Sequence, residues 1–188
     1  MSCKPVIAIL IVASAGTAIA DNYNIDPNHT YPSFEADHFG ISVLRGKFTR
    51  SSGKVTLDRA GKTGSVDITI DANSVDFGHP ALNQQARSAS MFNTEKFPSI
   101  TYSGKSIRFD GDRPVAVQGE LTLLGVTKPV TLTINKFKCI TPAYLKREVC
   151  GADASAEINR AEYGLGFMSP PHAPEVRLAI QVEAIKTE

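Results

Sequence analysis

The amino-acid sequence predicts an all-β domain of about eight or nine antiparallel strands with one short covering helix. Three observations lead to this fold class. Apolar residues alternate with polar ones over most of the chain, turn residues separate the alternating runs, and a single segment has helical spacing. The pattern fits a packed sandwich and a closed barrel equally well, and a barrel of eight strands has room for one small ligand.

The period-two runs follow one another along the chain. The first begins at Phe34 and ends at His38, and the clearest spans residues 176–184, where five apolar residues share one face. Turns are expected at Ser51-Ser52-Gly53, Ala60-Gly61, Asp110-Gly111-Asp112 and Gly125. The remaining runs are centred on Val55 and Leu57, on Val66, Ile68 and Ile70, on Ile100 and Tyr102, on Ile107 and Phe109, and on Val115 and Val117.

Residues 119–134 are typical of two antiparallel strands around a tight turn. The apolar residues that share a face are Leu121 and Leu123 before the turn, and Val130, Leu132 and Ile134 after it. Gly125 supplies the permissive backbone at the corner. The hairpin contains no catalytic constellation, so we expect it to serve function as part of a container.

One segment, residues 80–92, interrupts the strands. Leu82, Ala86 and Phe92 recur at helical spacing, and Pro80 suits the first turn of a helix. We therefore expect one amphipathic helix that covers an open end of the sandwich or barrel.

Residues 1–20 have the features of a secretory signal peptide. Lys4 precedes an apolar run, and Ala18-Ile19-Ala20 forms a small-residue cleavage site. A membrane anchor is the alternative, but small and polar residues interrupt the run before the roughly 18 to 20 residues that a span needs. We expect a single mature domain, residues 21–188, in the periplasm or outside the cell.

The expected mature chain is formally neutral. The whole sequence has 20 Lys and Arg against 19 Asp and Glu, and Lys4 leaves with the signal peptide. A neutral chain has no electrostatic footprint for a polyanion. The sequence therefore predicts no nucleic-acid partner, and it also predicts no stable membrane insertion.

Cys139 and Cys150 remain after Cys3 leaves with the signal peptide. Two cysteines close in sequence, in an oxidising compartment, favour a disulfide. Closing a loop of this size contributes about 3 kcal/mol in the chain-entropy model. A redox-active pair is the alternative, but its usual Cys-x-x-Cys spacing is missing.

The sequence contains no recognisable catalytic or metal-binding motif. The histidines His29, His38, His79 and His172 fall in separate segments, and phosphate-loop, dinucleotide and nucleophile-elbow patterns are missing. We therefore expect no catalytic residue, no metal and no required cofactor. His38 shares a face with Phe34 and Ala36, where it is either a hydrogen-bonded structural residue or a ligand contact.

Four landmarks make the chain similar to the YceI family, secreted bacterial proteins also described as polyisoprenoid-binding and lipocalin-like. In chain order they are Phe34 with His38, Gly40, Gly46 and Phe48; Arg87-Ser88 with Phe92 and residues 96–100; residues 119–130; and Arg160 with Tyr163-Gly164. The resemblance covers essentially all of the expected mature sequence. At the helix the chain departs from the family pattern, because Ala86 precedes Arg87 where the family commonly has Leu.

The resemblance implies an extended antiparallel eight-stranded lipocalin-like barrel around a long apolar tunnel. The implied ligand is a polyisoprenoid, a quinone, or a fatty acid or fatty amide. Family proteins are often dimers, so a homodimer is a further expectation. The expected ligand contacts are Phe34, His38, Phe48, Ile68, Arg87, Phe92, Ile100, Leu121, Leu123, Phe137, Arg160, Tyr163 and Phe167.

The leading functional hypothesis is noncatalytic binding, storage or transport of a long-chain isoprenoid or related lipid, such as a quinone or polyprenol, in the periplasm of a Gram-negative bacterium. Two alternatives stay open. One is a stress-response or structural surface module whose cavity is incidental, and the other is an enzyme acting on an isoprenoid or quinone. The sequence leaves open the identity, length and head group of the ligand, and the strand faces that line a tunnel.

Overall fold

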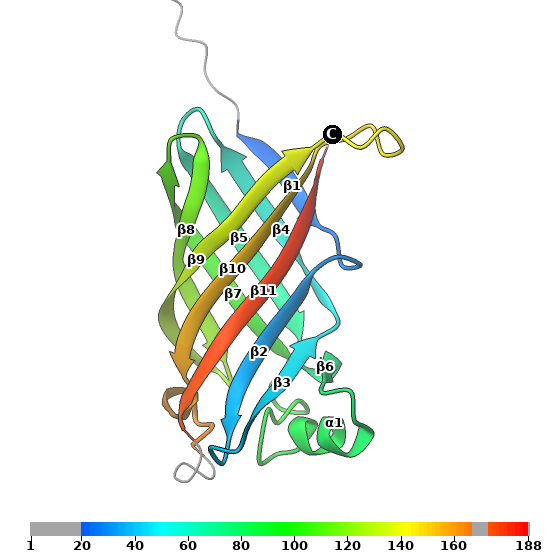
Figure 1. Ribbon diagram of the computed structural model, residues 1–188, viewed down its shortest axis with the longest axis vertical. Coiled ribbons are helices and arrows are strands. Elements are labelled where there is room, and N and C mark those ends of the chain that lie inside the picture. Colours follow the sequence, from blue (N-terminus) through cyan, green and yellow to red (C-terminus); the bar gives the residue numbers. More distant parts are fainter. Residues whose placement is uncertain (1–19, 167–172, 188) are drawn as a thin grey trace, which may run out of the picture.

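The computed structural model describes residues 20–166 and 173–187, and Figure 1 shows an elongated antiparallel barrel. The signal peptide expected at residues 1–20 lies almost wholly outside the described residues. In chain order the elements are β1 (Asp21–Ile25), β2 (Tyr31–His38), β3 (Ser42–Phe48), β4 (Ser51–Asp58), β5 (Thr63–Asp71), η1 (Ala72–Ser74), β6 (Val75–Asp76), α1 (Pro80–Arg87), β7 (Ser99–Asp110), β8 (Arg113–Leu123), β9 (Val126–Ile140), β10 (Val149–Asn159), η2 (Arg160–Tyr163) and β11 (Glu175–Lys186).

Eight strands close into a ring, because β1 pairs with β4 on one side and with the end of β11 on the other. The ring continues through β5, β7, β8, β9 and β10, and neighbouring strands are antiparallel throughout. The expected eight-stranded antiparallel barrel is confirmed. The sandwich that the alternation alone left open is excluded.

Strands β2, β3 and β6 extend the barrel wall beyond this ring. β2 takes the place of β1 beside the first half of β11, β3 pairs with β2, and β6 pairs with β3. The helix α1 packs beside β6 (Figure 1). We call this end of the barrel, which also holds the β2–β3 and β8–β9 turns, the α1 end. The opposite end holds Cys139 and Cys150, and we call it the disulfide end.

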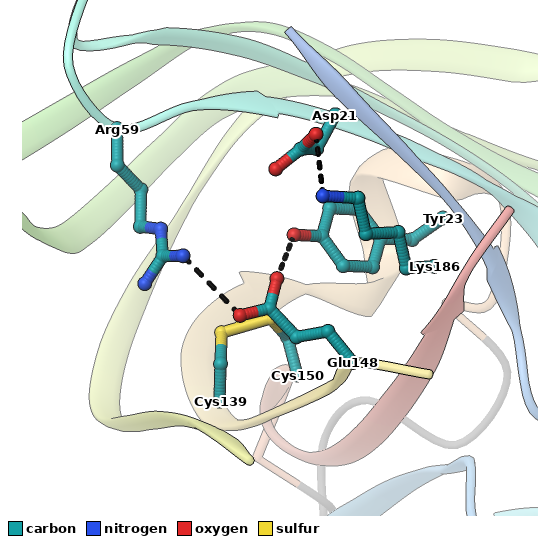
Figure 2. Close-up of a disulfide and its surroundings, with 7 residues drawn as sticks. All are labelled: Asp21, Tyr23, Arg59, Cys139, Glu148, Cys150 and Lys186. Atoms are coloured by element: carbon teal, nitrogen blue, oxygen red, sulfur yellow. Dashed lines mark hydrogen bonds and ion pairs between the residues drawn. A yellow bond between two sulfur atoms is a disulfide. The ribbon is translucent and has the colours of Figure 1, made fainter. Parts of the chain in front are cut away.

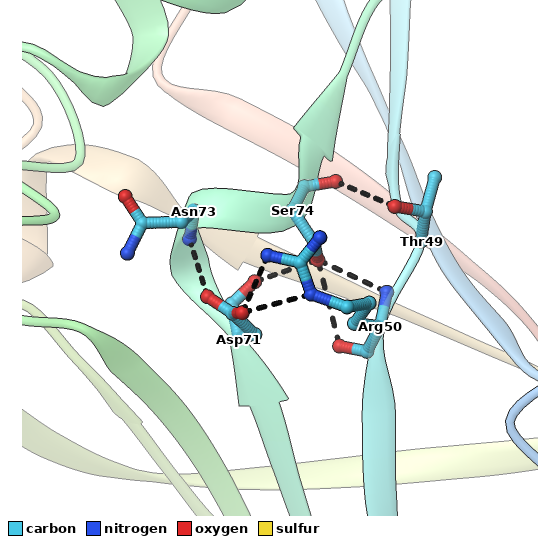
Figure 3. Close-up of polar contacts among 5 residues, drawn as sticks. All are labelled: Thr49, Arg50, Asp71, Asn73 and Ser74. Carbon is cyan, nitrogen blue, oxygen red and sulfur yellow. Dashed lines mark hydrogen bonds and ion pairs between the residues drawn. The ribbon is translucent and has the colours of Figure 1, made fainter.

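Polar contacts to η1 brace the corner between β3 and β4 (Figure 3). The Arg50 guanidinium donates from Nε and Nη2 to Asp71 Oδ2 at 3.0 and 2.6 Å, and Asp71 Oδ1 accepts from the Asn73 N–H at 2.8 Å. The Thr49 N–H and hydroxyl donate to the Ser74 carbonyl oxygen at 3.1 and 3.2 Å. These contacts hold η1, and with it the start of β6, against the segment that joins β3 to β4.

The turn expected at Ser51-Ser52-Gly53 is wrong, because these residues begin β4. Gly53 lies opposite Ile68 in the β4–β5 ladder, and a Cβ at Gly53 would lie 2.2 Å from the Asp67 carbonyl oxygen. The glycine therefore permits a close approach of two strands. The chain changes direction just before, at residues 49–50.

The helix expected over residues 80–92 is present but ends at Arg87. Ser88 has extended backbone, and its hydroxyl donates to a carbonyl of the last helical turn at 2.7 Å. This local hydrogen bond competes with continuation of the helix. The chain then folds back and places the Phe92 ring 5.5 Å from the Phe48 ring. Among the described residues, no helix has both the length and the apolar character needed to cross a membrane.

The strand β10 has no large alternating residues to predict it. Its inner face carries Ala152, Ala154 and Ala156, and a full ladder to β11 together with a shorter ladder to β9 holds it in the sheet. Partners far away in the sequence therefore define this strand. Its small side chains leave space inside the barrel.

Candidate ligand-binding cavity

A cavity of about 590 Å³ lies inside the barrel. Side chains from every strand of the closed ring line it, and most of them are aliphatic or aromatic. This volume is within the roughly 300 to 1,000 Å³ that is typical of small-molecule sites. The inner residues are only partly buried in many strands because they face this space rather than one another.

The strand periodicity decides which residues face the cavity. In β11 the lining residues are Val176, Leu178, Ile180, Val182 and Ala184. In the hairpin of β8 and β9 they include Leu121, Leu123, Val130, Leu132 and Ile134. The apolar face recognised on each side of the β8–β9 turn is therefore the inner face. Leu124 and Gly125 make this turn with φ angles of 52° and 76°, as a two-residue type I′ turn requires.

The cavity opens at the α1 end. Among the described lining residues, the solvent-exposed ones are Phe39, Leu82 and Gln85, which belong to the β2–β3 turn and to α1. The disulfide end is closed by a buried cluster that consists of Tyr23, Ile25, Leu57, Cys150 and Ala184. The opening of the cavity therefore lies beside α1.

Two polar side chains in the cavity wall are satisfied by the backbone. Tyr102 Oη lies 3.0 Å from the carbonyl oxygens of both Val117 and Val130 and can donate to either. Thr30 Oγ1 donates to the Glu183 carbonyl oxygen at 3.1 Å. Burial raises the pKa of Tyr102 to about 12, so its phenol stays protonated at neutral pH. A chain inside the barrel therefore meets an apolar wall.

Polar side chains gather at the opening. The polar lining residues of the α1 end are Asp37, His38, Gln85 and Arg160. Both Asp37 carboxylate oxygens accept from the Gly40 N–H, at 3.1 and 3.0 Å, and Arg160 Nη1 donates to the Leu165 carbonyl oxygen. This arrangement can contact a polar head group while the wall contacts an apolar chain.

Four phenylalanine rings pack against one another near the opening, namely Phe34, Phe48, Phe77 and Phe92. The Phe34 ring is at the centre, 5.7 Å from the Phe48 ring and 5.5 Å from the Phe77 ring. Gly46 makes room for it, because a Cβ at Gly46 would lie 2.5 Å from Phe34 Cζ. The family landmark that includes Gly46 thus corresponds to a packing requirement.

Ten of the thirteen expected ligand contacts line the cavity. They are Phe34, His38, Phe48, Ile68, Phe92, Ile100, Leu121, Leu123, Phe137 and Arg160. Arg87 and Tyr163 lie outside the lining: the Arg87 carbonyl accepts from Thr94, and the Tyr163 side chain is buried in the core. Phe167 falls outside the described residues.

Several lining residues escaped prediction from the sequence. Ile25 of β1 and Ala152 and Ala154 of β10 belong to strands without a strong alternation. Leu178 and Ile180 of β11 could have been found, because their alternation is the clearest in the chain. In a strand, residues two positions apart lie on the same face. Applying this rule along the whole of β11 would have added both residues to the expected contacts.

The predicted disulfide between Cys139 and Cys150 is confirmed, and the two residues are direct neighbours in the β9–β10 ladder. Figure 2 shows the polar cluster around it. The Tyr23 hydroxyl donates to Glu148 Oε1 at 2.6 Å, and Arg59 Nη2 lies 3.3 Å from Glu148 Oε2. Burial is the main cause that raises the pKa of Tyr23, and the hydrogen bond to the Glu148 carboxylate raises it further. This cluster closes the disulfide end.

Two groups of side chains in the described part of the chain bring three potential metal-ligand atoms together. One is Cys139, Glu148 and Cys150, and the other is Asp26, His29 and Glu183. The sulfurs of the first group are joined to each other. In the second, His29 Nδ1 lies 2.7 Å from Asp26 Oδ2, and this hydrogen bond lowers the pKa of Asp26 and raises that of His29. The second group lies outside the cavity lining.

The fold and the cavity define a class of protein, a closed antiparallel barrel around an apolar cavity that opens at one end. A family model described as a YceI-like domain matches residues 23–184, and the chain belongs to this family. Protein YceI of Escherichia coli O157:H7 is 35% identical over 180 residues, which cover 94% of this chain and 93% of that protein. The resemblance recognised in the sequence is confirmed.

Solved structures share the barrel. Burkholderia cenocepacia BcnA matches with a TM-score of 0.71 and 23% identity, covering 85% of this chain and 98% of that one. A domain from Saccharophagus degradans, described as a polyisoprenoid binding domain implicated in plant cell wall breakdown, matches with a TM-score of 0.65 and 18% identity, covering 88% and 98%. At these identities the likeness shows the fold alone.

Proposed function

We propose that the protein binds one long-chain lipid of the isoprenoid type in its cavity and carries or stores it, without chemical change, in the periplasm. The observation that carries this proposal is the cavity of about 590 Å³, which has an apolar wall and opens at the α1 end beside Asp37, His38 and Arg160. The Saccharophagus degradans domain, described as polyisoprenoid binding, has the same fold and adds support.

The cavity volume suggests the length of the bound chain. An engineered apolar cavity of about 150 Å³ holds one benzene molecule. A cavity of about 590 Å³ therefore has room for roughly four benzene volumes, on the order of 24 carbon atoms. We infer that the cavity holds about five isoprene units, and that a longer tail leaves part of its length at the opening.

The energetics of such a chain suit a carrier. Each buried methylene gains about 0.8 kcal/mol relative to water, so roughly 24 carbons gain on the order of 19 kcal/mol. A bilayer offers the chain nearly the same gain. The free energy of transfer between the membrane and the barrel is therefore close to zero. The polar residues at the opening then favour binding of one kind of head group.

The polar groups of the cavity support binding over catalysis. Tyr102 is held as a protonated donor to backbone carbonyls, and the other polar lining side chains of the α1 end lie where a head group enters. An enzyme needs convergent titratable groups at a reacting atom. The cavity also argues against a structural module whose core is filled by side chains.

The disulfide of Cys139 and Cys150 supports an oxidising compartment, and the expected signal peptide at residues 1–20 agrees with it. Both features support the proposed periplasmic location. A homodimer remains a prediction, which sedimentation of the purified protein will test.

The test is to purify the mature protein from the periplasm, extract it with organic solvent and identify the lipid by mass spectrometry. We expect about one isoprenoid per chain, and an added polyprenol or quinone recovered with its mass unchanged. If neither a stoichiometric lipid nor binding of added polyprenol or quinone is found, the proposal fails. A changed mass on recovery would favour an enzyme.

A further inference from the structure

The rim of the cavity opening carries exposed apolar side chains. Phe39, Ile41, Val43 and Leu82 are 43%, 80%, 49% and 39% exposed, and we call these four residues the mouth patch. Phe39 and Leu82 also line the cavity, so the patch continues directly into the apolar wall. Single exposed apolar residues are ordinary, but a group of them around a cavity opening marks an interaction surface.

The two segments that carry the mouth patch contain no carboxylate. Residues 38–44 and 77–94 have no Asp or Glu, and their charged residue is Arg87. The aspartates that precede them are engaged: Asp37 accepts from the Gly40 N–H, and Asp76 accepts from Gly78 and Asn83. The two segments therefore carry apolar side chains and one cation, which suits an anionic lipid surface.

The β2–β3 turn holds its part of the patch in a fixed conformation. Phe39 and Gly40 have φ angles of 59° and 71°, and left-handed backbone is unfavourable for a bulky residue. The Asp37 carboxylate caps the Gly40 N–H, and the Ile41 N–H donates to the His38 carbonyl oxygen at 3.1 Å. Backbone strain at an exposed aromatic residue is typical of a functional contact.

We propose that the α1 end docks on the surface of a lipid bilayer, with the mouth patch inserted among the outer acyl chains. The cavity then opens directly into the membrane. An apolar chain passes between bilayer and barrel without crossing water, which would cost most of its burial free energy. This inference takes its biological purpose from the proposed lipid-carrier function, but docking itself can be measured without any ligand.

The geometry favours a bilayer over a second copy of the chain. A copy seated on the mouth patch would cover the opening, whereas a bilayer covers it and supplies the ligand. The first residue of β1 and the last residue of β11 lie at the disulfide end, away from the α1 end (Figure 1).

The test uses two matched variants of the mature protein, Ile41→Asp in the mouth patch and Ile140→Asp at the disulfide end. Both isoleucines are exposed, at 80% and 52%, so neither change should unfold the barrel. The first measurement is flotation with vesicles of phosphatidylethanolamine and phosphatidylglycerol, without ligand. We expect the wild type and Ile140→Asp to float with the vesicles, and Ile41→Asp to lose about tenfold in bound fraction.

The second measurement is the rate at which the protein takes up ubiquinone from such vesicles, which should also fall about tenfold for Ile41→Asp alone. Docking is overturned if the wild type does not float, or if both variants lose the same share of the vesicle-bound fraction. It is also overturned if Ile41→Asp merely converts a dimer into a monomer, which would make the patch an interface between copies. Flotation of a protein that takes up neither ubiquinone nor polyprenol would support docking and refute the carrier function.

Discussion

Ala152 of β10 faces the cavity between Phe137 of β9 and Val182 of β11, in the half of the barrel that the disulfide end closes. It is only partly buried, because its methyl group borders the empty space. Ala152→Phe should place an aromatic ring in this closed half. The barrel should stay folded, since the ring fills a cavity rather than a packed core.

The size of the effect follows from the cavity volume. A phenyl group needs about as much room as benzene, for which about 150 Å³ suffices. That is roughly a quarter of the about 590 Å³ available. The longest chain that the cavity fully encloses should therefore shorten by about six carbons, or about one isoprene unit. For a ligand that fills the wild-type cavity, the gross loss relative to water is about 5 kcal/mol.

The assay is competitive binding of a series of prenols that differ by one isoprene unit. The affinity of the wild type should rise with chain length to about five units and then level off, and Ala152→Phe should level off about one unit earlier. Ala179→Phe is the matched control, because Ala179 lies on the outer face of β11 between two lining residues. An unchanged length limit in folded Ala152→Phe, or an equal shift in Ala179→Phe, would refute the assignment of the cavity as the chain site.

Three further changes test other parts of the structure. Gly46→Ala should swing the Phe34 ring into the cavity and weaken lipid binding in a protein that still folds; unchanged binding would contradict the packing argument. Cys150→Ser should lower the free energy of unfolding by about 3 kcal/mol in urea titrations, as should reducing the wild type, and the bound lipid should stay the same. Tyr102 has a folded pKa of about 12, above its ordinary value of 10.0, so its neutral form stabilises the fold up to about pH 10, and this stability is lost as the pH rises to about 12. Tyr102→Phe should remove a share of about 3 kcal/mol from the alkaline loss of stability, with the share of Tyr23 remaining; a loss identical to that of the wild type would show that folding does not raise the pKa of Tyr102.

Sequence reasoning recovered much of the candidate site, because the face on which a strand residue lies follows from its spacing to neighbouring residues. Leu121 and Leu123 share a face in any strand that contains both, and the structure turns that face inward. The errors came from residues whose role depends on distant partners. Gly53 looked like a turn residue but accommodates the backbone of β5, and Arg87 belongs to a helix whose cavity-lining residues are Leu82, Gln85 and Ala86.

By itself, the sequence determined the antiparallel strand pattern, the disulfide pair, the single helix and membership of the YceI family, since each depends on neighbouring residues or on short motifs. Closure of the barrel was decided by the tertiary structure, because it requires β1 to pair with both β4 and β11. The same holds for the cavity. Its volume is the barrel interior minus the inward side chains, and the small residues of β10 leave part of that interior empty. A period of two tells which residues share a face, but only the closed ring shows that this face points inward and that the faces of different strands meet.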